Sequence, residues 1–407
     1  MSVDEQVRRK YGRYGPGSRT RSARSRARKR RGLLIFCATV VVVVVAAAFA
    51  FDYLVESEPT PLARAAAASA AAPPSDAGQK PKERTAALPP LNLPADDAPH
   101  GSAMEWWYYS GVLDAKGGQR FGFHMVVFVA NGLIKHTVMH AALTDLQTGK
   151  RYTSQMRTAG TPANGGASGG TNGFDFRQEG WQVSATPASH RLRAAIEGGT
   201  SVDLALRDGG QVVAHRAPGS ETPGLLDFGA SGISYYYSRP RLQAVGEITV
   251  GGKPLRVGGD IWFDHQWGEF DVLTLGWNWF ALHLSDGSDL MLYELFDTEG
   301  RSVMTAGTIS SEQGSVPLRA GEIELVPGNR WVSPRTHLAY PVEWRLKLPS
   351  GVLDIKPFQP DSEFDSSATT ANVYWEGPVK VSGVLTGEGF LELSGYDRLD
   401  AKQAPRK

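Results

Sequence analysis

The chain has 407 residues, with 43 basic and 42 acidic side chains, and its formal net charge of +1 averages two opposite regions. Residues 1–31 hold twelve Lys or Arg against two acidic residues, which leaves 31 basic and 40 acidic residues in the rest of the chain. The single cysteine, Cys37, excludes an internal disulfide and a thiol nucleophile in the body of the protein.

An apolar run follows this basic block. Residues 33–51 are nineteen uncharged residues, just long enough to cross a bilayer core as a helix. We therefore expect a basic cytoplasmic tail (1–32), a single transmembrane helix (33–54) and an extracytoplasmic body at the cell membrane. A cleaved signal peptide is the competing interpretation, because the alanines at 46–48 offer small residues. The position of the basic block indicates topology control and contact with anionic lipid, and no nucleic-acid partner is expected.

The next segment, residues 55–98, is rich in Ala and Pro and has no aromatic residue, which predicts a disordered linker. The body beyond it shows the period-two alternation of β strands, as at Phe121, Phe123 and Met125. Turn signals separate such runs, and no long stretch has apolar residues at helical spacing. An all-β body of this size favours two barrels or a pair of sandwiched sheets.

Residues that carry chemistry gather in a few aromatic clusters, of which Trp-Phe-Asp-His-Gln-Trp-Gly at 262–268 is the densest. Because side chains alternate along a strand, Asp264 and His265 are expected on opposite faces, with Trp267 on the face of His265. Burying several ionisable groups against aromatic surface is costly, so the pattern favours a functional pocket over core packing alone. Core packing, with the polar groups satisfied by backbone hydrogen bonds, is the alternative.

Common catalytic and cofactor motifs are missing from the sequence. There is no His-Glu-x-x-His, no cysteine pair and no Gly-x-Gly-x-x-Gly that follows a strand ahead of a helix. A Gly-x-Ser-x-Gly string at 166–170 lies among small residues, with no apolar strand leading into it. We therefore expect neither a metal nor an organic cofactor.

Six motifs resemble, in order, those of the carotenoid 1,2-hydratase/AttH-like family over about residues 100–398. They are Glu105-Trp106-Trp107-Tyr108, Tyr235-Tyr236-Tyr237-Ser238, Asp264-His265-Gln266-Trp267-Gly268, Gly276-Trp277-Asn278-Trp279-Phe280, Tyr374-Trp375-Glu376-Gly377 and Gly389-Phe390-Leu391-Glu392-Leu393-Ser394-Gly395-Tyr396. The resemblance implies two lipocalin-like β-barrels packed together, which we place at residues 99–270 and 271–400, with a pocket near their junction.

The resemblance also implies site residues. The family's His-x-Trp hydratase motif matches His265 and Trp267, and its downstream tyrosine matches Tyr293. Leu295 stands where a carotenoid hydratase would have an acidic residue, with Glu294 alongside. The expected catalytic residues are Asp264, His265, Trp267, Tyr293 and Glu294. The expected ligand-binding residues are Glu105, Trp106, Trp107, Tyr236, Trp277, Trp279 and Trp375.

Two functions fit these residues. A hydratase would protonate an isolated carbon–carbon double bond of an isoprenoid or lipid from Asp264 or Glu294, stabilise the cation on Trp267 and activate water with His265. Some family members hydrate carotenoids or prenylated phenolics, while others are exported proteins, some encoded with ABC-transport components. The alternative is a non-catalytic carrier or an accessory protein of an ABC-type transport system. A third interpretation is an extracytoplasmic interaction module with a filled core.

Overall fold

The structure is a computed structural model that describes residues 88–403 except 133–134, 160–172, 210–211, 218–219, 221 and 320. All of these residues belong to one structural unit, Asp76–Lys407. The predicted basic tail, the predicted membrane span and most of the predicted linker lie outside the described residues. Within the described ranges, no helix has the length and apolar character needed to cross a membrane.

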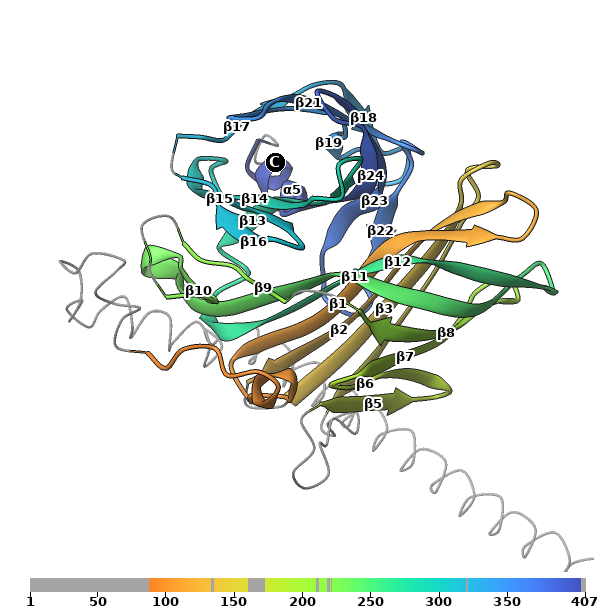
Figure 1. The fold of residues 1–407 in the computed structure, drawn as a ribbon. Coiled ribbons are helices and arrows are strands. Elements are labelled where there is room, and N and C mark those ends of the chain that lie inside the picture. The colour runs from red at the N-terminus through yellow and green to blue at the C-terminus, as the bar shows by residue number, and fades with distance from the viewer. Residues whose placement is uncertain are drawn as a thin grey trace, which may run out of the picture. The chain divides into compact units, whose positions relative to one another are not determined.

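Two antiparallel sheets contain most of the described chain, which confirms the all-β prediction (Figure 1). The first sheet has twelve strands: β1 (Met104–Ala115), β2 (Arg120–Asn131), β3 (Lys135–Asp145), β4 (Arg151–Ala159), β5 (Phe174–Gln178), β6 (Trp181–Thr186), β7 (Ser189–Ile196), β8 (Thr200–Asp208), β9 (Val213–Ala214), β10 (Leu225–Asp227), β11 (Gly232–Val250) and β12 (Lys253–Phe270).

The second sheet has ten strands: β13 (Leu275–Leu284), β14 (Asp289–Asp297), β15 (Ser302–Ser311), β16 (Gly314–Pro317), β17 (Glu324–Pro327), β20 (Trp344–Leu348), β21 (Gly351–Pro357), β22 (Glu363–Asp365), β23 (Val373–Gly383) and β24 (Gly387–Ser394). Strands β18 (Arg330–Val332) and β19 (Ala339–Pro341) pair separately. The helical elements are η1 (Ala95–Asp97), η2 (Gly229–Ser231) and α5 (Tyr396–Gln403).

The central strands of the first sheet bury both of their faces. The order β4-β3-β2-β1-β12-β11-β8-β7-β6-β5 places β1 between β2 and β12. On one face, Trp107 and Phe263 lie in the sheet's own hydrophobic core, which we call the first core. On the other face, Tyr108 and Trp262 are buried with residues of the second sheet. Because alternate residues of β1 and β12 enter different environments, β1 is buried along most of its length and β12 is buried throughout residues 261–268.

The second sheet encloses a core of its own, the second core, which includes Phe280, Leu391 and Trp375. Its order is β16-β15-β14-β13-β24-β23-β21-β20-β17. Figure 1 shows α5 inside the curl of this sheet, where Tyr396 joins the second core. The C-terminal helix therefore fills space that the strands leave inside the sheet.

A third buried group joins the two sheets, and we call it the intersheet cluster. The first sheet contributes Tyr108 and Trp262, and the second contributes Trp279, Tyr293 and Phe390, among others. Elsewhere along the contact, β2 and β23 approach each other so closely that a Cβ at Gly122 would lie 2.6 Å from Cγ of Pro378. Only a residue without a side chain fits at that position.

The end of the predicted linker is ordered, which differs from the expectation for residues 88–98. Leu91 and Leu93 pack against the first core, and Tyr235 donates a 2.8 Å hydrogen bond to the carbonyl oxygen of Pro89. Asp97, in η1, is only 5% exposed, and Arg239 donates to both of its carboxylate oxygens. Composition alone predicted disorder, whereas these few apolar and acidic side chains have partners far along the chain.

Candidate functional site

The structure places the predicted site residues in three groups. Those associated with the intersheet cluster are Asp264, Tyr293, Tyr236, Trp106, Trp277 and Trp279. Those on the side of the first core are His265, Trp267, Glu105 and Trp107. Those on the side of the second core are Glu294 and Trp375.

Strand alternation explains this separation. Asp264 pairs across β1 and β12 with Tyr108, and His265 pairs with Trp107, so the neighbours face opposite sides as the sequence predicted. Tyr293 and Glu294 divide in the same way, and Asn278 donates a 3.0 Å hydrogen bond to Glu294 on the inner side of the second sheet. The five expected catalytic side chains therefore do not share one pocket.

Asp264 is the centre of a buried hydrogen-bond network in the intersheet cluster. Its carboxylate accepts hydrogen bonds from Trp262 Nε1 (2.6 Å), the Ser238 hydroxyl (2.5 Å) and the Tyr236 hydroxyl (2.8 Å). Trp279 Nε1 donates in turn to the Tyr236 hydroxyl at 2.9 Å. Burial raises the pKa of Asp264 to about 7, although the three donors act to lower it. Asp264 is 3% exposed, and the hydrogen bonds that it accepts hold the three donor side chains in place.

Two further acids on the same face were not identified from the sequence. Glu376 on β23 and Glu392 on β24 are cross-strand neighbours. Glu376 is fully buried and accepts a short hydrogen bond from the Tyr108 hydroxyl. Burial raises the pKa of Glu376 well above its usual range, and it raises the pKa of Glu392 to about 7 against the hydrogen bond from Trp277. Both carboxyl groups therefore hold protons more tightly than carboxyls in water.

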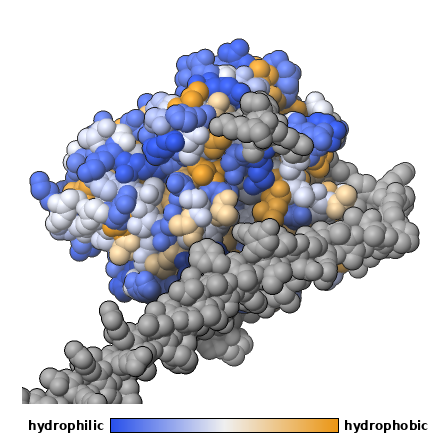
Figure 2. Space-filling view, turned by 180° about the vertical axis from the view of Figure 1, so that it is seen from behind, coloured by the Kyte–Doolittle hydropathy of each residue, from blue (hydrophilic) through white to orange (hydrophobic). Residues whose placement is uncertain are grey.

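Glu392 differs from Asp264 and Glu376 because its side chain is only partly buried. The partly buried hydrophobic side chains packed against the intersheet cluster are Trp106, Phe128, Phe270, Trp277 and Met304, of which Trp277 donates to Glu392. Figure 2 shows hydrophobic residues at the surface near the middle of one face, amid mostly hydrophilic ones. Tyr293 is 4% exposed, and its hydroxyl has no partner among the described residues. Glu392 thus combines a raised pKa, a hydrogen bond from Trp277 and partial exposure of the residue.

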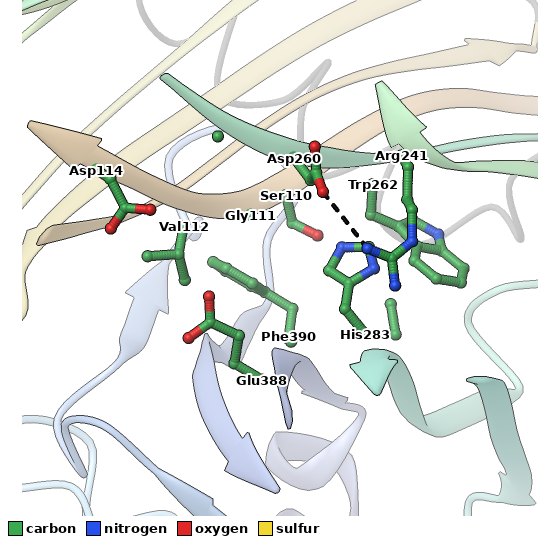
Figure 3. A pocket seen from close by; sticks show the side chains of 13 residues that line it. Ser110, Gly111, Val112, Asp114, Arg241, Asp260, Trp262, His283, Glu388 and Phe390 are labelled. Atoms are coloured by element: carbon green, nitrogen blue, oxygen red, sulfur yellow. Dashed lines mark hydrogen bonds and ion pairs between the residues drawn. The ribbon is translucent and has the colours of Figure 1, made fainter. Parts of the chain in front are cut away.

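A cavity of about 310 Å³ opens between the sheets beside this network. Figure 3 shows Trp262, His283 and Phe390 around it, with an Arg241–Asp260 ion pair of 3.4 Å near the rim. Its complete lining is Ser110, Gly111, Val112, Asp114, Arg241, Gly259, Asp260, Trp262, Ala281, His283, Glu388, Gly389 and Phe390. Trp262 and Phe390 each precede an acid, Asp264 or Glu392, by two residues on the same strand face. The cavity therefore ends one layer of side chains away from the acids.

The first core contains a separate polar group near its edge. Glu105 Oε1 lies 2.9 Å from Nε2 of His265 and 2.8 Å from Nδ1 of His100. Burial alone would raise the pKa of Glu105, but its hydrogen bonds with the two histidines outweigh burial and lower it to about 2. The His100 ring stacks on Trp267 at 3.8 Å, and Trp107 stacks on His265 at 4.6 Å.

This second group has the composition of a metal site. His100, Glu105 and His265 each offer one ligand atom, and these three atoms lie within 4.8 Å of one another. Among the described His, Cys, Asp and Glu side chains, this group has the spacing that suits a metal ion. His100 was not identified from the sequence, because it precedes the aromatic motifs and no pattern connects it to them. The chain thus presents two chemically distinct places, one with protonated acids and aromatics and one with imidazoles and a carboxylate.

Comparison with known proteins gives the family context. A family model described as AttH-like matches residues 84–396. Among solved structures, a protein from Nitrosomonas europaea described as an AttH is 27% identical with a TM-score of 0.66, and the match covers 76% of this chain and 98% of that one. The fold of the described residues is therefore that of a solved protein of similar extent.

Two matches are to kievitone hydratase. The curated enzyme from Fusarium solani subsp. phaseoli is 25% identical over 181 residues, which are 42% of this chain and 51% of that protein. The chain thus matches about half the length of this curated relative. The crystal structure of kievitone hydratase from Nectria haematococca has a TM-score of 0.59 at 18% identity, and the match covers 76% of this chain and 94% of that one. At that identity the structural likeness concerns the fold alone.

Proposed function

Because the chain belongs to the AttH-like family, we propose that it is a hydratase that binds a large apolar molecule between two lipocalin-like barrels and adds water across an isolated carbon–carbon double bond. The observation that carries this proposal is Glu392, a carboxyl with a pKa raised to about 7 and partly exposed beside the rings of the intersheet cluster. An acid of this kind is about half protonated at pH 7 and can act as a general acid.

In the proposed reaction, Glu392 donates its proton to the less substituted alkene carbon, which leaves a tertiary cation on the neighbouring carbon. The π faces of Trp277 and Trp106 stabilise that cation, an effect of about 1–2 kcal/mol for each well-placed ring. Water attacks the cation and returns one proton to the Glu392 carboxylate, so that the acid is restored and the sum of the steps is addition of one water molecule. No step in this sequence needs a redox or organic cofactor.

The other residues of the network position these groups. Asp264 fixes Tyr236 and Trp262 through the hydrogen bonds it accepts, and Tyr236 in turn holds the Trp279 indole. Tyr293 contributes an unpartnered hydroxyl to the same space, where it can orient the attacking water. His265 and Trp267, on the opposite face of β12, take no direct part in this version of the reaction.

We place the two barrels at residues 99–270 and 271–400, as the sequence suggests, and propose that the body is exported and anchored by the apolar segment at 33–54. The proposed substrate is an isoprenoid or lipid, because a partly exposed aromatic surface favours binding of an apolar molecule. A role beside an ABC-type transporter would require the same surface to hold a lipid without changing it, and the experiment below distinguishes these two uses.

The test incubates the full-length protein in detergent with an acyclic isoprenoid alkene and with kievitone, the substrate named for the relative, in ¹⁸O-labelled water. Mass spectrometry should detect a product heavier by one labelled water molecule. Glu392→Gln should lower turnover at least about 1,000-fold, within the range expected for loss of general acid catalysis. Glu299→Gln, a change at an exposed acid paired with Arg301, should leave turnover unchanged. Full turnover by Glu392→Gln would refute the assignment, and an unaltered lipid that co-purifies without any turnover would favour the carrier.

A further inference from the structure

The polar group at the edge of the first core has a hydrogen-bond arrangement that a bound cation would complete. Its starting point is Asp97, whose two carboxylate oxygens accept hydrogen bonds of 2.9 and 3.1 Å from the Arg239 guanidinium. A carboxylate held in this way is ionised and has no proton to donate. The 2.5 Å contact between Asp97 and the Tyr237 hydroxyl therefore uses the single proton of Tyr237.

The next contact in the chain is between the Tyr237 oxygen and Nδ1 of His265, at 3.2 Å. Since Tyr237 donates its proton to Asp97, its oxygen can only accept from His265, and it does so in the tautomer that carries the proton on Nδ1. In the neutral imidazole, Nε2 then has a free lone pair. That lone pair lies 2.9 Å from Oε1 of Glu105, which is itself an ionised carboxylate.

Two lone pairs at this distance repel each other unless a cation lies between or beside them. His100 completes the group from the other side, with Nδ1 at 2.8 Å from the same Oε1. We propose that His100, Glu105 and His265 together bind a divalent transition-metal ion such as zinc. Without an ion, His265 would carry its proton on Nε2 and donate it to Glu105, which would leave no proton in the 3.2 Å contact between Nδ1 and Tyr237.

The donor set and its dimensions suit zinc. Two imidazole nitrogens and one carboxylate oxygen are common zinc ligands, with bonds of about 2.0–2.2 Å that place ligand atoms about 3.4 Å apart in a tetrahedron. The donor atoms in this chain span 2.8 to 4.8 Å, so small movements bring them to that spacing. His100 is 21% exposed, which leaves an open side for a water ligand.

Both histidines also have the outer partners that orient metal-binding imidazoles. Tyr237 accepts from Nδ1 of His265, as derived above. On the far side of the site, Nε2 of His100 lies 3.6 Å from a carboxylate oxygen of Asp96. The Tyr237 contact favours the tautomer that leaves Nε2 of His265 free for the metal, and the Asp96 carboxylate lies within ion-pair distance of His100. The stacked rings of Trp107 and Trp267 hold the imidazole planes in place.

The proposed ion would connect three distant parts of the chain, because His100 lies in the segment before β1, Glu105 on β1 and His265 on β12. Metal binding would therefore stabilise the docking of residues 88–100 on the first sheet. This proposal does not depend on the hydratase proposal, since the two sites lie on opposite faces of β12.

The test uses full-length protein in detergent, purified without a polyhistidine tag and stripped with a chelator. Calorimetric titration with zinc should give one site per chain, and cobalt should give the visible absorption bands of a tetrahedral ion. His100→Ala and Glu105→Gln should each weaken zinc binding at least about 100-fold, and Tyr237→Phe should weaken it about 10–100-fold through His265. His136→Ala, at a histidine outside the site whose ring lies within hydrogen-bond distance of the Arg157 guanidinium, is the matched control and should bind as the wild type does.

His100 is at the edge of the fold, so His100→Ala is expected to fold even if Glu105→Gln does not, and near-ultraviolet circular dichroism checks both. The proposal is overturned if the folded wild type takes up no zinc at millimolar concentration. It is equally overturned if folded His100→Ala binds zinc as tightly as the wild type, since the ion would then be held elsewhere.

Discussion

Replacing Glu392 by Gln should change how the stability of the protein depends on pH. The folded state raises the pKa of Glu392 from 4.5 to about 7, so it binds the proton more tightly than the unfolded chain does. The resulting stabilisation is fully present below pH 4.5 and is lost as the pH rises through 7. Glutamine cannot ionise, so Glu392→Gln removes this contribution to the pH dependence.

The size of the effect follows from the shift. A difference of 2.5 pKa units corresponds to about 3 kcal/mol, because one unit is 1.36 kcal/mol. Glu376 contributes in the same direction and is retained in the variant, so part of the wild-type pH dependence should remain. Relative to wild type, the variant should therefore gain about 3 kcal/mol of unfolding free energy between pH 4.5 and pH 8.

Urea unfolding followed by tryptophan fluorescence, at pH steps from 4.5 to 8, measures this difference. Any loss of packing or of the Trp277 hydrogen bond shifts the unfolding free energy of the variant by the same amount at every pH. It does not alter how that free energy depends on pH. Glu299→Gln, at an exposed acid, should give a curve parallel to that of the wild type. The reasoning is refuted if the difference between Glu392→Gln and wild type is the same at pH 4.5 and pH 8.

Three other substitutions test the intersheet cluster. Tyr293→Phe removes a buried hydroxyl that has no partner in the described part of the chain, so the unfolding free energy should stay equal or rise by about 1 kcal/mol, and a loss above about 1 kcal/mol would contradict this. Tyr108→Phe removes the donor to buried Glu376 and should cost about 1–3 kcal/mol in urea unfolding, whereas no cost would mean that the carboxyl finds another partner. Trp277→Ala should lower kcat/KM about 10-fold or more through the lost ring face, and unchanged kinetics would remove Trp277 from the site.

Features that depend on neighbours in the sequence were predictable. Period-two alternation and turn residues gave the all-β class, and the same alternation gave the opposite faces of Asp264 and His265. The aromatic motifs identified both places where ionisable groups are buried. The family resemblance agrees with the match to residues 84–396.

Features that depend on contacts across the fold were not predictable. Glu392 stands between Leu391 and Leu393, a pattern that normally marks a strand with one face in water, yet that face packs against the first sheet. His100 reaches His265 only because η1 and the residues beside it fold over the first core. Alternation predicted opposite faces for Asp264 and His265, but no local pattern shows that both faces of β12 are buried there.

The two buried faces of β12 also limit how this protein can vary. On an ordinary half-exposed strand, every second residue tolerates substitution, but residues 261–268 of β12 are all buried, with alternate side chains facing the first core and the intersheet cluster. A single inserted residue would exchange the two sets and move His265 to the position of Asp264. Laboratory evolution of specificity should therefore succeed mainly at the rim of the cavity and in the loops, and insertions within β12 should be among the least tolerated changes in the chain.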